Sequence, residues 1–238
     1  IWFQDTTQSG TSSSFNLGAS NNASVDHWWY PTAAQAAAGF SKQVFAPTDW
    51  NGQIWYQVNL YDNGNISFFY RGGANFQYIY AALPSNFLNQ WNHVAVASDT
   101  SNNLSIFFNG VRVATTVATI GLTSTTPNYI TFGQQAAGQT VSSLKGYMAN
   151  LRFIQGTGAF NAASSTITIP TAPPTATATT QLLLNCTNAG IYDGTMKNNL
   201  ETVGNAQVST SVVKYGSGSM YFDGSGDYLY LPASQNTV

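Results

Sequence analysis

The stretch that decides the fold is "NLSIFFNGVRVATT", residues 103–116, in which two apolar and β-branched segments flank Asn109-Gly110. An Asn-Gly pair supplies the positive φ values of a type I′ turn, which joins two adjacent antiparallel strands. With this turn, Phe108 faces Val111 and Ile106 faces Val113, so that both strands place apolar side chains on one face. The stretch therefore predicts a β-hairpin with one buried face.

Similar strand patterns surround this hairpin. A second hairpin is predicted in "IWYQVNLYDNGNISFFYRG", residues 54–72, where Asn63-Gly64 supplies the turn. Shorter strands are predicted at residues 24–30, 42–46, 77–83, 92–98, 128–134 and 146–154. Because many short strands alternate with turns and helical periodicity is nearly absent, the sequence predicts an all-β fold built as a sandwich or barrel.

The composition excludes several classes of function. Only 7% of the 238 residues are charged and the formal net charge is -2, so no basic surface for nucleic acid or for an anionic membrane is expected. No apolar run approaches the ~20 residues of a transmembrane helix. The lone Cys186 rules out an internal disulfide, so the fold must be held by packing and strand pairing.

A proline-rich stretch divides the chain. "PTAPPTATATT", residues 170–180, has no large apolar side chain and predicts an extended linker. We therefore expect a β domain at residues 1–169, a linker at 170–180 and further strands at 181–238. Because the chain opens on Ile1 and not on Met, it is expected to be a processed product or a segment of something longer.

The last strands echo the first residues. "MYFDGSGDYLYLPAS", residues 220–234, matches the opening "IWFQDTTQSGTSSSFNLGAS" in its apolar-aromatic-Phe triplet, its turn and its closing Leu-x-Ala-Ser. Two interpretations follow. Residues 181–238 are either the opening strands of a second copy of the domain, or strands that complete a sandwich in the same chain or in a neighbouring one.

Three motifs in order resemble the laminin G-like jelly roll of the concanavalin A-like lectin and glucanase superfamily. They are "DHWWYPT" at residues 26–32, "WNHVAVASDTSNNLSIFFNGVRVAT" at 91–115 and "GYMANLRFIQGTGAF" at 146–160. "GNAQVSTSVVKYGSGSMYFDGSGDYL", residues 204–229, looks like the family's opening segment, displaced to the end of the chain. The resemblance implies a two-sheet antiparallel jelly-roll sandwich.

Tandem copies of this module with few charges and Thr- and Pro-rich linkers look most like virion-associated proteins of bacteriophages. The resemblance implies a non-enzymatic structural or adhesive module at a virion surface, as a capsid decoration, fibre or appendage subunit. Its partners would be copies of itself, other virion proteins and cell-surface glycans. The alternative is a lectin-like adhesin of a bacterial surface.

Catalysis has little support in the residues. Relatives on this fold that are glucanases use two carboxylates across the scissile bond. This chain has a single glutamate, Glu201, in an asparagine-rich turn, its eight aspartates lie mostly in turns, and no predicted strand carries two carboxylates two or four positions apart. His27 and His93 each lie alone in apolar strands, and with Cys186 they give no zinc spacing. A polysaccharide hydrolase is therefore the third interpretation, and no catalytic residue is predicted.

Carbohydrate binding is the more specific hypothesis. A sugar ring stacks on an aromatic face while its hydroxyls bond to amides, and the first strand of the second hairpin alternates such residues. The candidate glycan-binding residues are Trp50, Trp55, Gln57, Asn59 and Tyr61, with Ile54, Tyr56, Val58 and Leu60 on the core face. Packing between subunits would explain the same aromatic residues, and a register error of one residue would exchange the two faces.

One candidate metal site remains. Laminin G-like modules can hold calcium at the rim of the sandwich, and "DGSGD" places Asp223 and Asp227 around two glycines. The simpler interpretation is an Asx-type turn that needs no ion, and this is the one we favour. No other cofactor is predicted.

Overall fold

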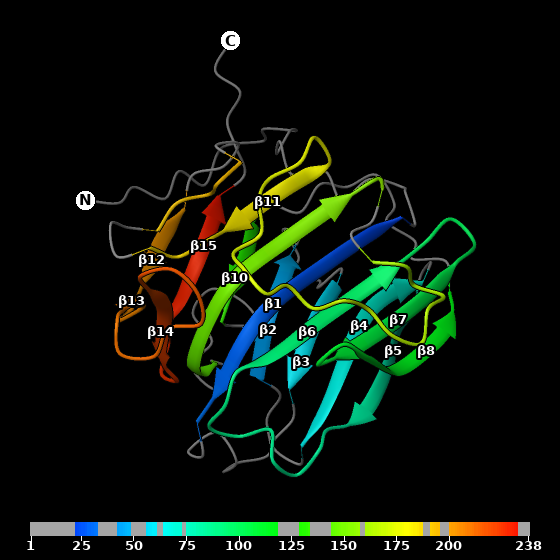
Figure 1. Ribbon diagram of the computed structural model, residues 1–238, viewed down its shortest axis with the longest axis horizontal. Coiled ribbons are helices and arrows are strands. Elements are labelled where there is room, and N and C mark those ends of the chain that lie inside the picture. Colours follow the sequence, from blue (N-terminus) through cyan, green and yellow to red (C-terminus); the bar gives the residue numbers. More distant parts are fainter. Residues whose placement is uncertain are drawn as a thin grey trace.

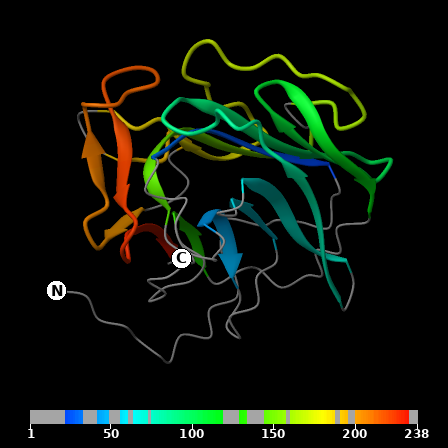
Figure 2. The same ribbon diagram turned by 90° about the horizontal axis from the view of Figure 1, so that it is seen from below.

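The structure is a computed structural model that describes residues 22–32, 42–48, 56–60, 64–72, 75–118, 129–133, 144–157, 160–187, 191–195 and 200–232. Within these residues every regular element is a β-strand, and the strands form two antiparallel sheets that pack face to face (Figures 1 and 2). The predicted all-β jelly-roll sandwich is confirmed. The same residues contain no helix that is long and apolar enough to cross a membrane.

The first sheet, sheet A, has the strand order β13-β14-β10-β1-β6-β7-β8, and β11 pairs with β10 beside this path. Its strands are β1 (Ala23–Pro31), β6 (Asn92–Ser98), β7 (Asn103–Phe108), β8 (Val111–Val117), β10 (Lys145–Gln155), β11 (Thr180–Leu184), β13 (Gln207–Ser209) and β14 (Ser219–Asp223). The three family-like motifs lie in β1, in β6 to β8 and in β10, and β10, β1 and β6 lie side by side at the centre of the sheet.

The second sheet, sheet B, has the order β12-β15-β9-β2-β3-β4-β5. Its strands are β2 (Lys42–Thr48), β3 (Tyr56–Leu60), β4 (Asn65–Gly72), β5 (Asn75–Ala82), β9 (Tyr129–Phe132), β12 (Glu201–Val203) and β15 (Tyr228–Pro232). Every strand predicted before residue 155 is therefore present.

One hydrophobic core fills the space between the two sheets. Alternate residues of β6 and β7 point into it, and the largest fully buried side chains of the core are Trp29, Phe68, Phe132, Phe153 and Phe222. These five come from strands of both sheets and from both ends of the chain. Because burial of apolar area is the main driving force of folding, this shared core holds the sheets together.

The β7–β8 hairpin forms as predicted at its turn. Asn109 and Gly110 have φ values of 49° and 85°, and Phe108 lies opposite Val111. The Asn109 side chain supports the turn, because its Oδ1 accepts a hydrogen bond from the His93 amide at 2.8 Å. One prediction of register was wrong: Ile106 lies opposite Ala114 and not opposite Val113.

A β-bulge explains that difference. The register shifts between Ile106 and Phe107, so one extra residue of β8 is inserted beyond Arg112 and the pairing moves by one position. Val113 still packs against the core, whereas Val111, on the outermost strand of the sheet, is exposed. The predicted common apolar face is therefore present for β7 and only partial for β8.

The strands beyond residue 180 belong to the same two sheets as the rest of the chain (Figure 1). The long strand β10 pairs with β1 on one side, and on the other side with β14 at residues 145–148 and with β11 at residues 151–154. In sheet B, β15 pairs with β9. In this structure the C-terminal strands thus extend both sheets in cis, while the domain boundaries at 169 and 181 stay a prediction.

The coil between β10 and β11 runs across the outer face of sheet A (Figure 2). The amide of Ile167 donates to the carbonyl of Gly110, and the carbonyl of Pro174, in the proline-rich stretch, accepts from Asn185 Nδ2 at 2.7 Å. Tyr215 Oη also donates to the carbonyl of Pro170 at 2.7 Å. These contacts attach the coil, including its proline-rich stretch, to the turn after β7, to Asn185 after β11 and to the loop between β13 and β14.

Candidate functional site

Two tyrosines on β5 are the most exposed aromatic side chains among the described residues. Tyr78 is 59% exposed and Tyr80 is 62% exposed, whereas Ile79 and Ala81 between and beside them pack against the core. The ring centroids of Tyr78 and Tyr80 lie 5.7 Å apart, and Tyr78 stacks on Phe69 of β4 at 6.1 Å with nearly parallel planes. We call Phe69, Tyr78 and Tyr80 the aromatic ladder.

The aromatic ladder follows from strand periodicity. In "NFQYIYAA" the tyrosines alternate with apolar residues, so one set of side chains enters the core and the other faces outward. The cross-strand register then places Phe69 opposite Tyr78. The result is an outward-facing aromatic surface on the outer side of sheet B.

The predicted glycan-binding residues belong to the neighbouring strand of the same sheet. Gln57 and Asn59 lie in β3, opposite Phe69 and Ser67 in the backbone register. Val58 between them is buried in the core, as predicted for its face. Trp50, Trp55 and Tyr61 lie outside the described residues. Glycan binding at these five residues therefore stays a prediction.

Sequence reasoning predicted the strand at residues 77–83 and missed its tyrosines as site candidates. The signal was present, because the alternation Tyr-Ile-Tyr-Ala is the same kind of pattern that singled out β3. What the sequence did not give was the pairing of β5 with β4, which brings Phe69 against Tyr78.

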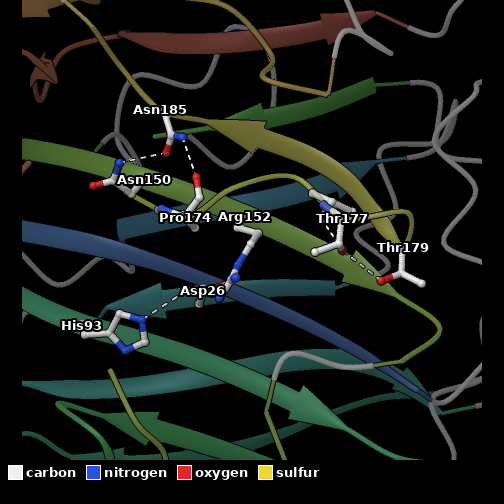
Figure 3. Close-up of polar contacts among 9 residues, drawn as sticks. Asp26, His93, Asn150, Arg152, Pro174, Thr177, Thr179 and Asn185 are labelled. Atoms are coloured by element: carbon white, nitrogen blue, oxygen red, sulfur yellow. Dashed lines mark hydrogen bonds and ion pairs between the residues drawn. The ribbon is translucent and has the colours of Figure 1, made fainter. Parts of the chain in front are cut away.

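A buried ionic cluster lies on the outer side of sheet A, where the three family-like motifs meet (Figure 3). Asp26 Oδ1 accepts a hydrogen bond from Arg152 Nε at 2.9 Å, and Asp26 Oδ2 accepts one from Arg152 Nη2 at 3.2 Å. His93 Nε2 lies 3.3 Å from the same Oδ2. The three residues come from β1, β10 and β6, which are adjacent strands.

Aromatic rings cover this cluster. Phe160, from the coil after β10, lies 5.9 Å from the His93 ring and 5.7 Å from the Arg152 guanidinium carbon. On the other side the Trp28 ring meets His93 edge to face at 5.2 Å. Lys214 Nζ in turn lies 3.7 Å from the centroid of the Trp28 ring.

The cluster is structural and not catalytic in its geometry. The side chains of His93 and Asp26 are 0% and 2% exposed, so neither can reach a substrate in solution. A buried carboxylate needs a paired charge and hydrogen bonds to be tolerated, and Arg152 and His93 supply both. His93 is thus a buried structural residue of β6 that contacts the Asp26 carboxylate.

Asn150 lies where the strand paired with one edge of β10 changes, from β14 at residues 145–148 to β11 at residues 151–154. Its φ is 54°, and the register between β1 and β10 shifts at the neighbouring positions. Its Nδ2 donates to Asn185 Oδ1 at 2.9 Å, and Asn185 then holds the carbonyl of Pro174 (Figure 3). This chain of side-chain hydrogen bonds ties the proline-rich stretch to the central strand of sheet A.

His27 is fully buried in the core between Val25 and Trp29. Burial, reinforced by the neighbouring His93, lowers the pKa of His27 from 6.5 to about 3. Neither ring nitrogen has a hydrogen-bond partner in the described part of the chain. His27 is therefore a neutral core residue and not a ligand or a base.

The candidate calcium residues lie in a turn and accept hydrogen bonds from two amides of that turn and from the amide of Asn205. Asp227 Oδ1 and Oδ2 accept hydrogen bonds from the amides of Asn205 and Asp223 at 2.6 and 2.7 Å, and Asp223 Oδ1 accepts one from the amide of Ser225 at 2.7 Å. A hydrogen bond from the Asn205 side chain to Asp223 lowers the pKa of Asp223, whereas burial raises the pKa of Asp227.

The bond from the Ser225 amide to Asp223 has the pattern of an Asx turn, while calcium binding at Asp223 and Asp227 stays a prediction. Across the described residues, no group of three or more histidine, cysteine or acidic side chains could hold a metal ion. Glu201, the glutamate of the hydrolase interpretation, is exposed on β12 opposite Tyr230.

Two antiparallel sheets that pack face to face define the class of the protein as a β-sandwich domain. The family model of the concanavalin A-like lectin/glucanases superfamily, of laminin G type, matches residues 4–164. The chain belongs to this superfamily, and the resemblance seen in its three motifs is confirmed. No curated protein sequence matches the chain.

Solved structures with a related fold are distant. Domains LG4-5 of the mouse laminin alpha1 chain share 12% identity over 61% of this chain and 38% of theirs, with a TM-score of 0.43. A native heptameric SAP-like pentraxin from Limulus polyphemus shares 16% identity over 60% of this chain and 67% of its own, with a TM-score of 0.44.

The CBM40 of the Ruminococcus gnavus IT-sialidase, bound to alpha2,6 sialyllactose, shares 13% identity over 58% of this chain and 82% of its own, with a TM-score of 0.42. Similarities this weak carry no inference about the ligand of this chain.

Proposed function

We propose that this protein is a non-enzymatic, extracellular adhesion module that binds carbohydrate through the outer face of sheet B. The observation that carries the proposal is the pair Tyr78 and Tyr80, which are 59% and 62% exposed on adjacent outward positions of β5. Contiguous exposed aromatic side chains are typical of binding surfaces, and a sugar ring covers such a face with its C–H bonds.

Polar partners for the sugar hydroxyls would come from β3. The backbone register continues the row of Tyr78 and Phe69 to Gln57, so that an amide-bearing residue lies at the end of the row. We therefore extend the predicted set of Trp50, Trp55, Gln57, Asn59 and Tyr61 by the aromatic ladder. Neutral amides suit a ligand rich in hydroxyl groups, because amides both donate and accept hydrogen bonds.

A glycan array with the full chain, followed by titration of the strongest glycan, tests the proposal. Tyr78→Ala and Tyr80→Ala should each weaken binding about 5- to 30-fold, which corresponds to about 1–2 kcal/mol. Tyr192→Ala is the matched control, because Tyr192 is 50% exposed but lies outside sheet B. Absence of any bound glycan, or equal weakening by the Tyr192 variant, would refute the proposal.

We further place the module on a bacteriophage virion, with a bacterial surface adhesin as the alternative. The support is compositional: 7% charged residues and a polar share carried by Ser, Thr, Asn and Gln suit an exposed extracellular protein. Mass spectrometry of purified virions tests the first setting, and the cell-wall fraction of the host tests the second.

We propose that Asp223 and Asp227 form a turn rather than a calcium site. Three of their four carboxylate oxygens accept backbone amides, which leaves little capacity for a cation. The melting temperature should therefore be equal in millimolar calcium and in excess chelator. A rise of several degrees with calcium that Asp223→Asn abolishes would instead establish calcium binding.

A hydrolase remains the opposing interpretation of the same fold. Release of reducing sugar from a bound polysaccharide, lost on Glu201→Gln, would replace the binding-only proposal.

A further inference from the structure

The outer face of sheet A carries its own row of aromatic residues, formed by strands from distant parts of the chain. Tyr30 of β1 lies opposite Tyr147 of β10, and Tyr147 lies opposite Tyr221 of β14. The ring centroids of Tyr30 and Tyr147 are 5.8 Å apart, and those of Tyr147 and Tyr221 are 5.2 Å apart. All three rings are partly exposed.

A groove lies beside the β14 end of this row, next to β13. It has a volume of about 340 Å³ and is lined by two of the tyrosines and by β13 with the loop after it: Tyr147, Tyr221, Gln207, Val208, Ser209, Thr210 and Ser211. Gln207 lies directly opposite Tyr221, so the row of tyrosines ends on an amide-bearing residue. Binding sites for small molecules begin at about this size.

The lining has the chemistry of a neutral polyol site. Two aromatic rings offer apolar faces, while one amide and three hydroxyls offer hydrogen-bond donors and acceptors. None of the seven lining residues is charged. The nearest charged residues on β10 and β14 are Lys145 and Asp223, which lie opposite each other, two positions from the tyrosines, and carry opposite charges.

We propose that this groove binds an uncharged pyranose unit of a glycan, as a second site on the opposite side of the sandwich from the aromatic ladder. The sugar ring stacks on Tyr221 and contacts Tyr147, whose ring is tilted by 45° from that of Tyr221, and Gln207 and Ser209 bond to its hydroxyls. An acidic sugar is disfavoured, because its carboxylate would lose water without meeting a cation in the lining.

The site depends on the pairing of the C-terminal strands β13 and β14 with β10. Tyr147 comes from the closing motif of the matched domain, whereas Tyr221 and Gln207 come from residues beyond the match, which ends at 164. The groove therefore exists only when β13 and β14 join β10. Two sites on opposite faces would let one module bridge two glycan chains and raise its avidity.

Chemical-shift mapping on the isotope-labelled full chain tests this second site. The probes are three neutral disaccharides, cellobiose, lactose and N,N′-diacetylchitobiose, together with glucuronic acid. We expect at least one neutral probe to shift the amides of residues 207–211 and 221. Tyr221→Ala should weaken that binding at least about 10-fold and Gln207→Ala about 5-fold, whereas Tyr78→Ala should leave it unchanged.

Two variants are used so that unfolding of one variant is not mistaken for loss of the binding site. Gln207 is exposed, so its truncation preserves the fold even if Tyr221→Ala does not. The proposal is overturned if no neutral probe shifts these amides, if glucuronic acid binds more tightly than the neutral sugars, or if Gln207→Ala binds like the parent. Loss of binding in Tyr78→Ala together with normal binding in Gln207→Ala would place all recognition at the aromatic ladder. If Tyr78→Ala and Tyr80→Ala do not weaken glycan binding while the groove still binds sugar, only the proposal for the aromatic ladder is refuted.

Discussion

Asp26 and Arg152 are 126 residues apart in the sequence, yet their side chains form two parallel hydrogen bonds of 2.9 and 3.2 Å. The pair joins β1 to β10 on the outer side of sheet A, and His93 of β6 contacts the same carboxylate. It links three motifs that identify the superfamily, and it does so in a buried position. Its role is therefore to hold the centre of the sheet in one arrangement.

Arg152→Met should destabilise the protein by about 3–5 kcal/mol, because it leaves the buried Asp26 carboxylate with His93 as its remaining partner. Urea denaturation measures the change. Arg112→Met is the matched control: the Arg112 guanidinium donates to the Ala163 carbonyl in an exposed contact, so its loss should cost less than about 1 kcal/mol. Equal losses for the two variants would contradict a structural role for the Asp26 pair.

Acid should destabilise the protein through His27. Its pKa is lowered to about 3 in the folded state, against 6.5 for the free side chain. Between these values the unfolded chain binds a proton that the folded chain excludes, so stability falls as the pH drops from 6.5 toward 3. One proton accounts for at most about 1.4 kcal/mol per pH unit.

His27→Leu should reduce this slope and leave stability at pH 7 equal or higher, because the buried ring nitrogens have no partner among the described residues. The measurement is urea denaturation of both proteins from pH 4 to 7. Carboxylates titrate in both proteins, so the difference between the two curves isolates His27. If the free energies of unfolding of the two proteins change with pH in parallel, the pKa of His27 is not lowered by folding.

Gly133→Ala should be strongly destabilising. Gly133 follows β9 with a φ of 90°, and a Cβ there would lie 2.7 Å from the Phe222 ring of β14. We expect a loss of about 2–4 kcal/mol from backbone strain and overpacking together. Gly216→Ala is the control, because Gly216 also has a positive φ, 71°, but nothing lies within 4 Å of its Cβ position.

The difference between the two glycine variants, measured by thermal denaturation, reports the contact with Phe222 alone. If both variants lose equal stability, the close contact between Gly133 and the Phe222 ring does not contribute to the stability of the protein.

Removing residues 176–238 should prevent formation of a soluble folded monomer. β10 would lose both β11 and β14, β9 would lose β15, and the core would lose Leu182, Met220 and Phe222. Unpaired strand edges and exposed core surface favour aggregation. Size-exclusion chromatography and circular dichroism of residues 1–175 make the test. A monomer as stable as the full chain would show that these strands are dispensable and would favour their assignment to a second copy.

Much of the fold was predictable because its signals are local. Alternation of apolar and polar residues predicted each strand up to β10, and Asn109-Gly110 predicted the type of turn between β7 and β8. The bulge at Val113 was not predictable from the local sequence. It is a property of how β8 pairs with Ile106 and Phe107 of β7, and no residue type in β8 marks it.

The candidate sites were predictable only in part. Periodicity gives the side of a strand on which Tyr78 and Tyr80 lie, but not that Phe69 on the next strand would stack on Tyr78. Likewise nothing near Tyr147 in the sequence points to Tyr221, which lies 74 positions further on (221 − 147) and meets it only across the β10–β14 ladder.

The sequence by itself determined the class of fold and the superfamily, because strand propensity and turn chemistry act over a few residues. The tertiary structure alone decided that the strands after residue 180 join both sheets in cis, that Asp26, His93 and Arg152 meet under Phe160, and that Tyr147 and Tyr221 share a groove. These are long-range pairings, set by which sheet edges and apolar faces the whole chain can bury together.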